Sequence, residues 1–127
     1  MAEKTKFYIC KHCGNLVTFL NESGAPLVCC GDKMTYLEPN TVDAATEKHV
    51  PAVSVEGTKV TVDVGSVEHP MVAEHFIQWI YLATDKGNHV RKLVPSDKPH
   101  AEFVLVDETP VAVYEYCNLH GLWVKEI

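Results

Sequence analysis

Four cysteines near the start of the chain have the spacing of a metal site. They occur as Cys10-Lys-His-Cys13-Gly and, after fifteen intervening residues, as Cys29-Cys30-Gly. A Cys-x2-Cys-Gly stretch forms a tight knuckle whose backbone N–H groups point at the thiolates, and four thiolates fit one tetrahedral zinc or iron ion. The adjacent pair is unusual, because neighbouring side chains on an extended backbone point to opposite sides. Both can reach one ion only if the backbone turns or the tetrahedron distorts. A structural zinc clip that holds a segment too small for its own core remains an alternative.

A second set combines one cysteine with histidines at the ends of expected strands. Cys117 and His120 lie three positions apart in a strand-like run, and His49, His69 and His75 lie at the edges of other strands. Each histidine alone is more typical of an ordinary surface or half-buried residue. The hypothesis therefore depends on the whole set. If all five donors converge, they exceed the four ligands that close a structural zinc site.

Mixed imidazole and thiolate ligation narrows the choice of metal to iron or copper. A blue-copper site needs two histidines, one cysteine and a weak axial methionine. No methionine follows His120, and two of the histidines would then have no role. Five-coordinate iron with one open position fits better. The open position also separates an enzyme from a pure electron carrier, which needs none.

The composition excludes some classes of function. A net charge of −6 and a pI near 5.6 argue against nucleic-acid binding. The hydrophilic start and the lack of an apolar run of about 20 residues favour a cytoplasmic protein without a membrane segment. Five cysteines is an odd number, and thiols in a reducing compartment are more often metal ligands or redox groups than disulfides.

The elements that must position these donors are β-strands. Alternating polar and apolar residues and the turn residues between them predict seven short strands, at 51–55, 59–64, 76–83, 90–94, 102–106, 111–116 and 122–125. With only a helical turn or two expected near 42–48, they predict an all-β, antiparallel sandwich of immunoglobulin type. Shorter strands at 16–20 and 34–37 belong to the cysteine segment. The expected domains are therefore residues 1–38 and 39–127.

These motifs resemble those of desulfoferrodoxin, the two-iron form of superoxide reductase, along essentially the whole chain. The quartet of Cys10, Cys13, Cys29 and Cys30 is similar to a desulforedoxin-like domain. The resemblance to the catalytic centre is carried by Glu47-Lys48-His49-Val50-Pro51, His69-Pro70, His75 and Cys117-Asn118-Leu119-His120-Gly121.

The resemblance implies two iron ions per chain and the one-electron reduction of superoxide to hydrogen peroxide. Four histidine nitrogens would surround the catalytic Fe(II), with the Cys117 sulfur axial. It also implies a homodimer and a rubredoxin-like electron donor. Glu47 would occupy the sixth position of the ferric ion, and Lys48 would steer the anion and organise proton delivery. Without the resemblance, an ordinary solvated pair of charges is the preferred interpretation of Glu47 and Lys48.

Overall fold

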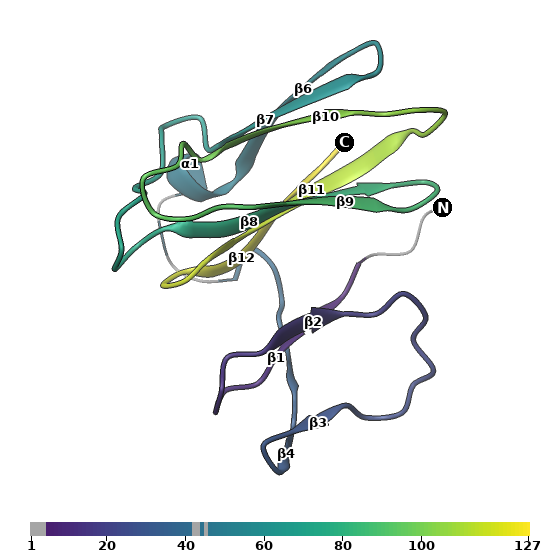
Figure 1. The fold of residues 1–127 in the computed structure, drawn as a ribbon, viewed down its shortest axis with the longest axis vertical. Helices are drawn as coiled ribbons and strands as arrows, with labels where there is room; N and C mark the ends of the chain where they lie inside the picture. The colour runs from purple at the N-terminus through teal and green to yellow at the C-terminus, as the bar shows by residue number, and fades with distance from the viewer. Residues whose placement is uncertain (1–4, 42–43, 45) are drawn as a thin grey trace. The chain divides into compact units, whose positions relative to one another are not determined.

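The computed structural model describes residues 5–41, 44 and 46–127 and divides the chain into two compact units, Met1–Glu38 and Pro39–Ile127 (Figure 1). The first unit contains an antiparallel three-stranded sheet and a hairpin. The sheet has the order β2 (Leu16–Thr18), β1 (Phe7–Ile9), β5 (Thr35–Tyr36), and the hairpin joins β3 (Val28–Cys29) to β4 (Asp32–Lys33). Among the described residues of this unit only Phe7 and Cys10 are buried. So small a core makes a bound metal a large part of the folding energy.

The second unit is a seven-stranded antiparallel sandwich, which confirms the predicted fold class. One sheet has the order β10 (His100–Val104), β7 (Lys59–Val64), β6 (Pro51–Glu56). The other has the order β12 (Gly121–Glu126), β11 (Pro110–Cys117), β8 (Ile77–Thr84), β9 (Asn88–Lys92). A single turn of helix, α1 (Thr46–His49), precedes β6.

The period-two pattern of the strands produces the core between the sheets. Val60, Val62 and Val64 alternate along β7 and are fully buried, and Val113 and Cys117 face the same core from β11. Cys117 is 0% exposed. A candidate metal ligand is thus built into the hydrophobic core, where packing fixes its position.

The structure departs from the predicted elements near the candidate ligands. The expected helical turn near 42–48 appears as α1, and residues 42, 43 and 45 lie outside the described residues. His75 does not open a strand: it exchanges two backbone hydrogen bonds of 3.0 Å with Val72 in a tight turn, and β8 begins at Ile77. Strand β1 and the hairpin β3–β4 were not predicted, because such short strands leave little periodicity. No helix of the described chain is long and apolar enough to cross a membrane.

Candidate metal centres

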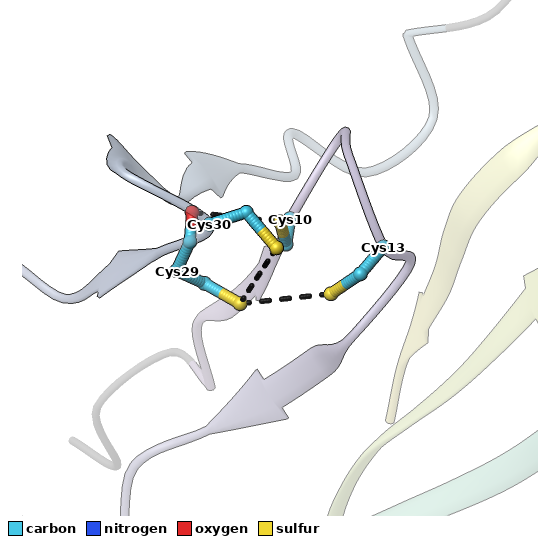
Figure 2. A group of neighbouring side chains, drawn as sticks. All are labelled: Cys10, Cys13, Cys29 and Cys30. Carbon is cyan, nitrogen blue, oxygen red and sulfur yellow. Dashed lines mark hydrogen bonds between the residues drawn. The ribbon is translucent and has the colours of Figure 1, made fainter.

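The four cysteines of the first unit converge, as their spacing predicts. Their sulfur atoms all lie within 4.8 Å of one another. The Cys13 sulfur is 3.6 Å from that of Cys29, which is 4.0 Å from that of Cys30 (Figure 2). Figure 2 shows these side chains pointing toward one another from the turn after β1 and from the hairpin β3–β4. The geometry is that of a four-thiolate site.

A turn of unusual backbone conformation lets the adjacent cysteines share one site. Cys29 ends β3, and the next two residues, Cys30 and Gly31, have φ of 53° and 81°. Two consecutive left-handed residues between paired strands form a type I′ hairpin turn. Cys29 and Cys30 therefore do not share an extended backbone, and their side chains need not point to opposite sides. The turn, rather than a distorted tetrahedron, reconciles the adjacent pair with one ion.

The pKa values of Cys10, Cys29 and Cys30 indicate that the quartet needs a bound cation. Hydrogen bonds from the backbone N–H of Cys13, and to a lesser extent His12, lower the pKa of the Cys10 thiol to about 6. Hydrogen bonding with the Cys13 thiol raises the pKa of Cys29 and raises that of Cys30 to about 12. The Cys10 thiolate thus forms readily, while Cys29 and Cys30 retain their protons. Only a bound metal ion can hold all four as thiolates at neutral pH.

The four predicted histidines of the second unit form a closed ring of imidazoles. His49 comes from α1, His69 and His75 come from the loop between β7 and β8, and His120 comes from the β11–β12 turn. Neighbouring ring centres are 4.6 Å apart for His49–His69 and His69–His75, 4.9 Å for His49–His120 and 5.0 Å for His75–His120. Neighbouring planes meet at 78° to 84°. The opposite rings of His49 and His75 are 6.4 Å apart and inclined by only 28°.

The size of this ring of imidazoles fits one metal ion. An ion about 2.1 Å from a ring nitrogen lies about 3.2 Å from that ring's centre. Opposite ring centres should then be about 6.4 Å apart and neighbouring ones about 4.5 Å, which is close to the observed 6.4 Å and 4.6 to 5.0 Å. The His49 Nε2 atom lies 3.1 Å from both His69 Nε2 and His120 Nδ1. The buried His75 Nε2 has no hydrogen-bond partner in the described structure. A metal ion would satisfy that nitrogen.

Cys117 supplies the fifth donor. Its sulfur and the ligand atoms of His49, His69 and His75 all lie within 4.8 Å of one another, and it is 4.0 Å from His120 Nδ1. A sulfur atom that is close to the ligand nitrogens of all four histidines lies near the axis of the ring that the four imidazoles form. Burial raises the pKa of the Cys117 thiol, and the backbone N–H groups of Leu119 and His120 oppose that shift. A metal would have to displace its proton.

Burial holds two of the imidazoles in the neutral form that binds metals. Desolvation lowers the pKa of His69 to about 4 and also lowers that of His75. His69 Nδ1 lies 2.7 Å from the carbonyl of Pro70. Because a carbonyl only accepts, Nδ1 carries the proton and Nε2 is left with a free lone pair.

Glu47 and Lys48 lie beside this centre in α1, and both side chains are exposed. The positive charge of Lys48 contributes to the lowered pKa of His75, after desolvation and the charge of His120. The ammonium of Lys48 is therefore within electrostatic reach of the imidazoles. Glu47 lies two positions before the candidate ligand His49, in the same helical turn.

Sequence reasoning missed three residues around this centre. Trp123 stacks on His49 with ring centres 4.9 Å apart, and its Nε1–H donates to the carbonyl of His120 at 3.0 Å. Asn118 contacts the His75 segment through its side-chain amide. Glu115 is 0% exposed, its carboxylate oxygens have no partner among the described residues, and burial raises its pKa far above the ordinary value. Only Asn118 had a signal, since it lies inside the Cys-Asn-Leu-His motif.

Two family profiles match nearly the whole chain: desulfoferrodoxin over residues 41–126 and the desulfoferrodoxin N-terminal domain over residues 2–37. The chain belongs to the desulfoferrodoxin family. A desulfoferrodoxin from Syntrophotalea carbinolica is 51% identical over 126 residues, which are 99% of each chain. The superoxide reductase from Treponema pallidum is 37% identical and superimposes with a TM-score of 0.82 over 98% of this chain and 100% of its own. A one-iron superoxide reductase from Giardia intestinalis is 32% identical, with a TM-score of 0.56 over 64% of this chain and 97% of its own.

Membership of the desulfoferrodoxin family identifies the metal of both centres. A desulfoferrodoxin has two iron sites, and the two donor groups of this chain correspond to them. The chain binds two iron ions, one at the four-cysteine group and one at the histidine–cysteine group. The predicted cofactors are confirmed, and zinc or copper is not needed at either group.

Proposed function

We propose that this desulfoferrodoxin is a superoxide reductase, which combines superoxide with one electron and two protons and releases hydrogen peroxide. The observation that carries the proposal is the closed ring of four imidazoles with the Cys117 sulfur near its axis. Such a site offers five protein donors and leaves one position open. Relatives from Thermococcus kodakarensis and Treponema pallidum that are described as superoxide reductases support the assignment.

The nine donors predicted from the sequence are the proposed iron ligands. Convergence within each group and the unpartnered nitrogen of His75 support this assignment. One iron belongs to a proposed domain of residues 1–38, and the other to a proposed catalytic domain of residues 39–127. The compact division of the chain supports these bounds. The ligands of the first iron are Cys10, Cys13, Cys29 and Cys30, and those of the second are His49, His69, His75, His120 and Cys117.

The protein's contribution to the chemistry is to prepare the donors. Bound Fe(II) supplies the single electron and an open position for the anion. Burial keeps His69 and His75 neutral and therefore able to bind the metal. The hydrogen bond from His69 to Pro70 and the stacking of Trp123 on His49 fix the directions of two rings. The Cys117 thiolate, held in the core, donates electron density and offsets one positive charge.

Lys48 is the proposed guide for superoxide. The substrate is an anion, and the chain as a whole has a net charge of −6, which repels it. A local ammonium beside the imidazoles counters that field and can organise water for proton delivery. Glu47, its exposed neighbour, is the proposed sixth ligand once the iron is ferric. Together they form the exposed part of the proposed catalytic group.

A cytoplasmic location, a homodimer and a rubredoxin-like electron donor complete the proposal. All five cysteines of the chain are free thiols, which suits a reducing compartment where they serve as ligands. The donor would return one electron to the site of His49, His69, His75, His120 and Cys117 after each turnover. An iron held by the four-cysteine group would relay that electron or stabilise its small domain.

Rapid mixing of the reduced protein with superoxide tests the proposed function. We expect oxidation of the iron at the histidine site and formation of one hydrogen peroxide for each superoxide consumed. An electron carrier without an open position would not react selectively with superoxide. Release of dioxygen in the amount that dismutation requires would contradict the reductase assignment.

A further inference from the structure

We propose that Asn118 is a positioning residue that holds the His75 segment against the turn carrying Cys117 and His120. The proposal rests on the ligand set proposed above. It concerns the one histidine ring of the site whose ligating nitrogen has no other partner in the described structure.

The side-chain amide of Asn118 spans the backbone on both sides of His75. Its Oδ1 atom accepts a hydrogen bond from the N–H of Phe76 at 2.9 Å, and its Nδ2–H donates to the carbonyl of Glu74 at 3.0 Å. The backbone N–H of Asn118 also donates to the carbonyl of Phe76, at 3.3 Å. Three hydrogen bonds thus connect one residue to the two neighbours of a ligand.

These bonds lie where the sheet itself cannot hold the two segments together. The register of β11 against β8 shifts between Tyr116 and Cys117, and the last pair is Cys117 with Ile77. The chain before Ile77 leaves the sheet and forms the tight Val72–His75 turn. The amide of Asn118 continues the connection beyond the last paired residues.

The chemistry of the amide suits this position. One end must accept from an N–H group and the other must donate to a carbonyl, and the side-chain amide of asparagine carries an acceptor oxygen and a donor nitrogen side by side. Asn118 directly follows Cys117 and lies two positions before His120. It therefore ties the direction of the His75 ring to the two ligands on its own turn. Partners of this kind typically affect metal affinity by about 10- to 100-fold.

Asn118→Ala is the test variant, and Asn40→Gly is its matched control. Asn40 makes an equivalent pair of amide hydrogen bonds, accepting from Val124 N–H at 2.9 Å and donating to the Val124 carbonyl at 3.2 Å, and neither residue is a proposed ligand. Its φ of 61° makes glycine the suitable replacement. Both variants lose two amide hydrogen bonds, so their effects on thermal stability should be similar.

The first measurement is the rate at which a ferrous chelator removes iron from the histidine site of the two-iron protein. We expect Asn118→Ala to release this iron about 10- to 100-fold faster than the parent and to shift the thiolate-to-iron absorption band of the oxidised site. Asn40→Gly should match the parent in both respects. Asn118→Asp keeps the acceptor for Phe76 N–H but loses the donor, so its release rate should fall between those of the parent and Asn118→Ala.

The second measurement needs no metal. In the metal-free protein, the Phe76 amide should exchange with deuterium faster in Asn118→Ala than in the parent or Asn40→Gly. Faster exchange with parental iron release and an unshifted band would overturn the proposal, as would equal iron loss in Asn118→Ala and Asn40→Gly. Neither measurement uses superoxide. A parent protein that fails to reduce superoxide would therefore refute the proposed function and leave this test intact.

Discussion

Replacing Gly65 with alanine should disturb the centre without removing a ligand. A Cβ atom on Gly65 would lie 2.5 Å from the carbonyl oxygen of Glu47, 2.9 Å from that of Val50 and 3.0 Å from the carbonyl carbon of Lys48. All three are backbone atoms of the segment that carries His49, so no side chain can rotate away to make room. The effect is steric, because the φ of Gly65 lies outside the left-handed region.

The size of the effect follows from the contact distances. Ordinary Cβ contacts begin near 3.4 Å, so the Glu47 carbonyl must move by about 0.9 Å. That carbonyl also accepts hydrogen bonds from Val67 N–H at 2.9 Å and from the Ser66 hydroxyl at 3.2 Å, which resist the movement. Overpacking of this kind destabilises a fold by about 1–3 kcal/mol. Misplacing catalytic groups by about 1 Å can reduce a rate by about 100-fold.

The assay is rapid mixing of the reduced variant with superoxide, together with thermal unfolding and iron analysis. Gly87→Ala is the matched control, since a Cβ there meets nothing within 4 Å and its φ also lies outside the left-handed region. We expect Gly65→Ala to retain the quartet iron, to unfold at a lower temperature and to react with superoxide up to about 100-fold more slowly. Parental rate and stability in Gly65→Ala would refute the reasoning that this glycine sets the position of the Glu47–His49 segment.

Three further perturbations test other parts of the molecule. Lys48→Gln should slow superoxide capture by about tenfold at low salt, with a difference that shrinks as salt rises because the Debye length is only about 8–10 Å near physiological ionic strength; equal rates at all salt concentrations would leave Lys48 as a solvated charge. Cys13→Ser should abolish the visible absorption of the quartet iron and lower stability, while the first oxidation of the histidine-site iron by superoxide stays fast; a slow first oxidation would mean that the two irons are not independent. In the metal-free protein, the folded pKa of His69 is about 4 and lies below its ordinary value of 6.5. The unfolded chain therefore binds the extra proton between these values, so the free energy of unfolding should fall by about 3 kcal/mol as the pH drops from 7 to 4. Urea titrations at both pH values check this, and a His69→Gln protein that shows the same pH dependence would contradict it.

Local patterns in the sequence were enough to predict the seven strands of the sandwich and to single out both donor sets. The alternation of Val60, Val62 and Val64 defines one buried face of β7 without knowledge of its partners. The Cys-x2-Cys-Gly knuckle is likewise a local signal. The turn at Cys30 was left open, because its left-handed backbone is clear only once β3 and β4 are seen to pair.

The contacts that orient the donors could not be predicted, because they join distant segments. Asn118 bonds to Phe76 across 42 positions, and Gly65 approaches Glu47 from a different element. Glu115 shows that residue type can also mislead about burial. Strand alternation assigns it to the same face as Val113 and Cys117, yet a carboxylate is expected to face water, and the structure buries it completely. Spacing identifies donors, whereas the parts that orient them depend on tertiary contacts.

The distribution of the imidazoles along the chain has a consequence for protein quality control. His49 and His120 contact each other across 71 positions, so an ion bound to both would close a loop that contains the whole sandwich. The folded state binds that ion far better than the unfolded chain does, and bound iron therefore lowers the unfolded fraction. Chains that lose the iron open more often and become substrates for proteases. Degradation would then remove inactive copies selectively, with no separate sensor of iron occupancy.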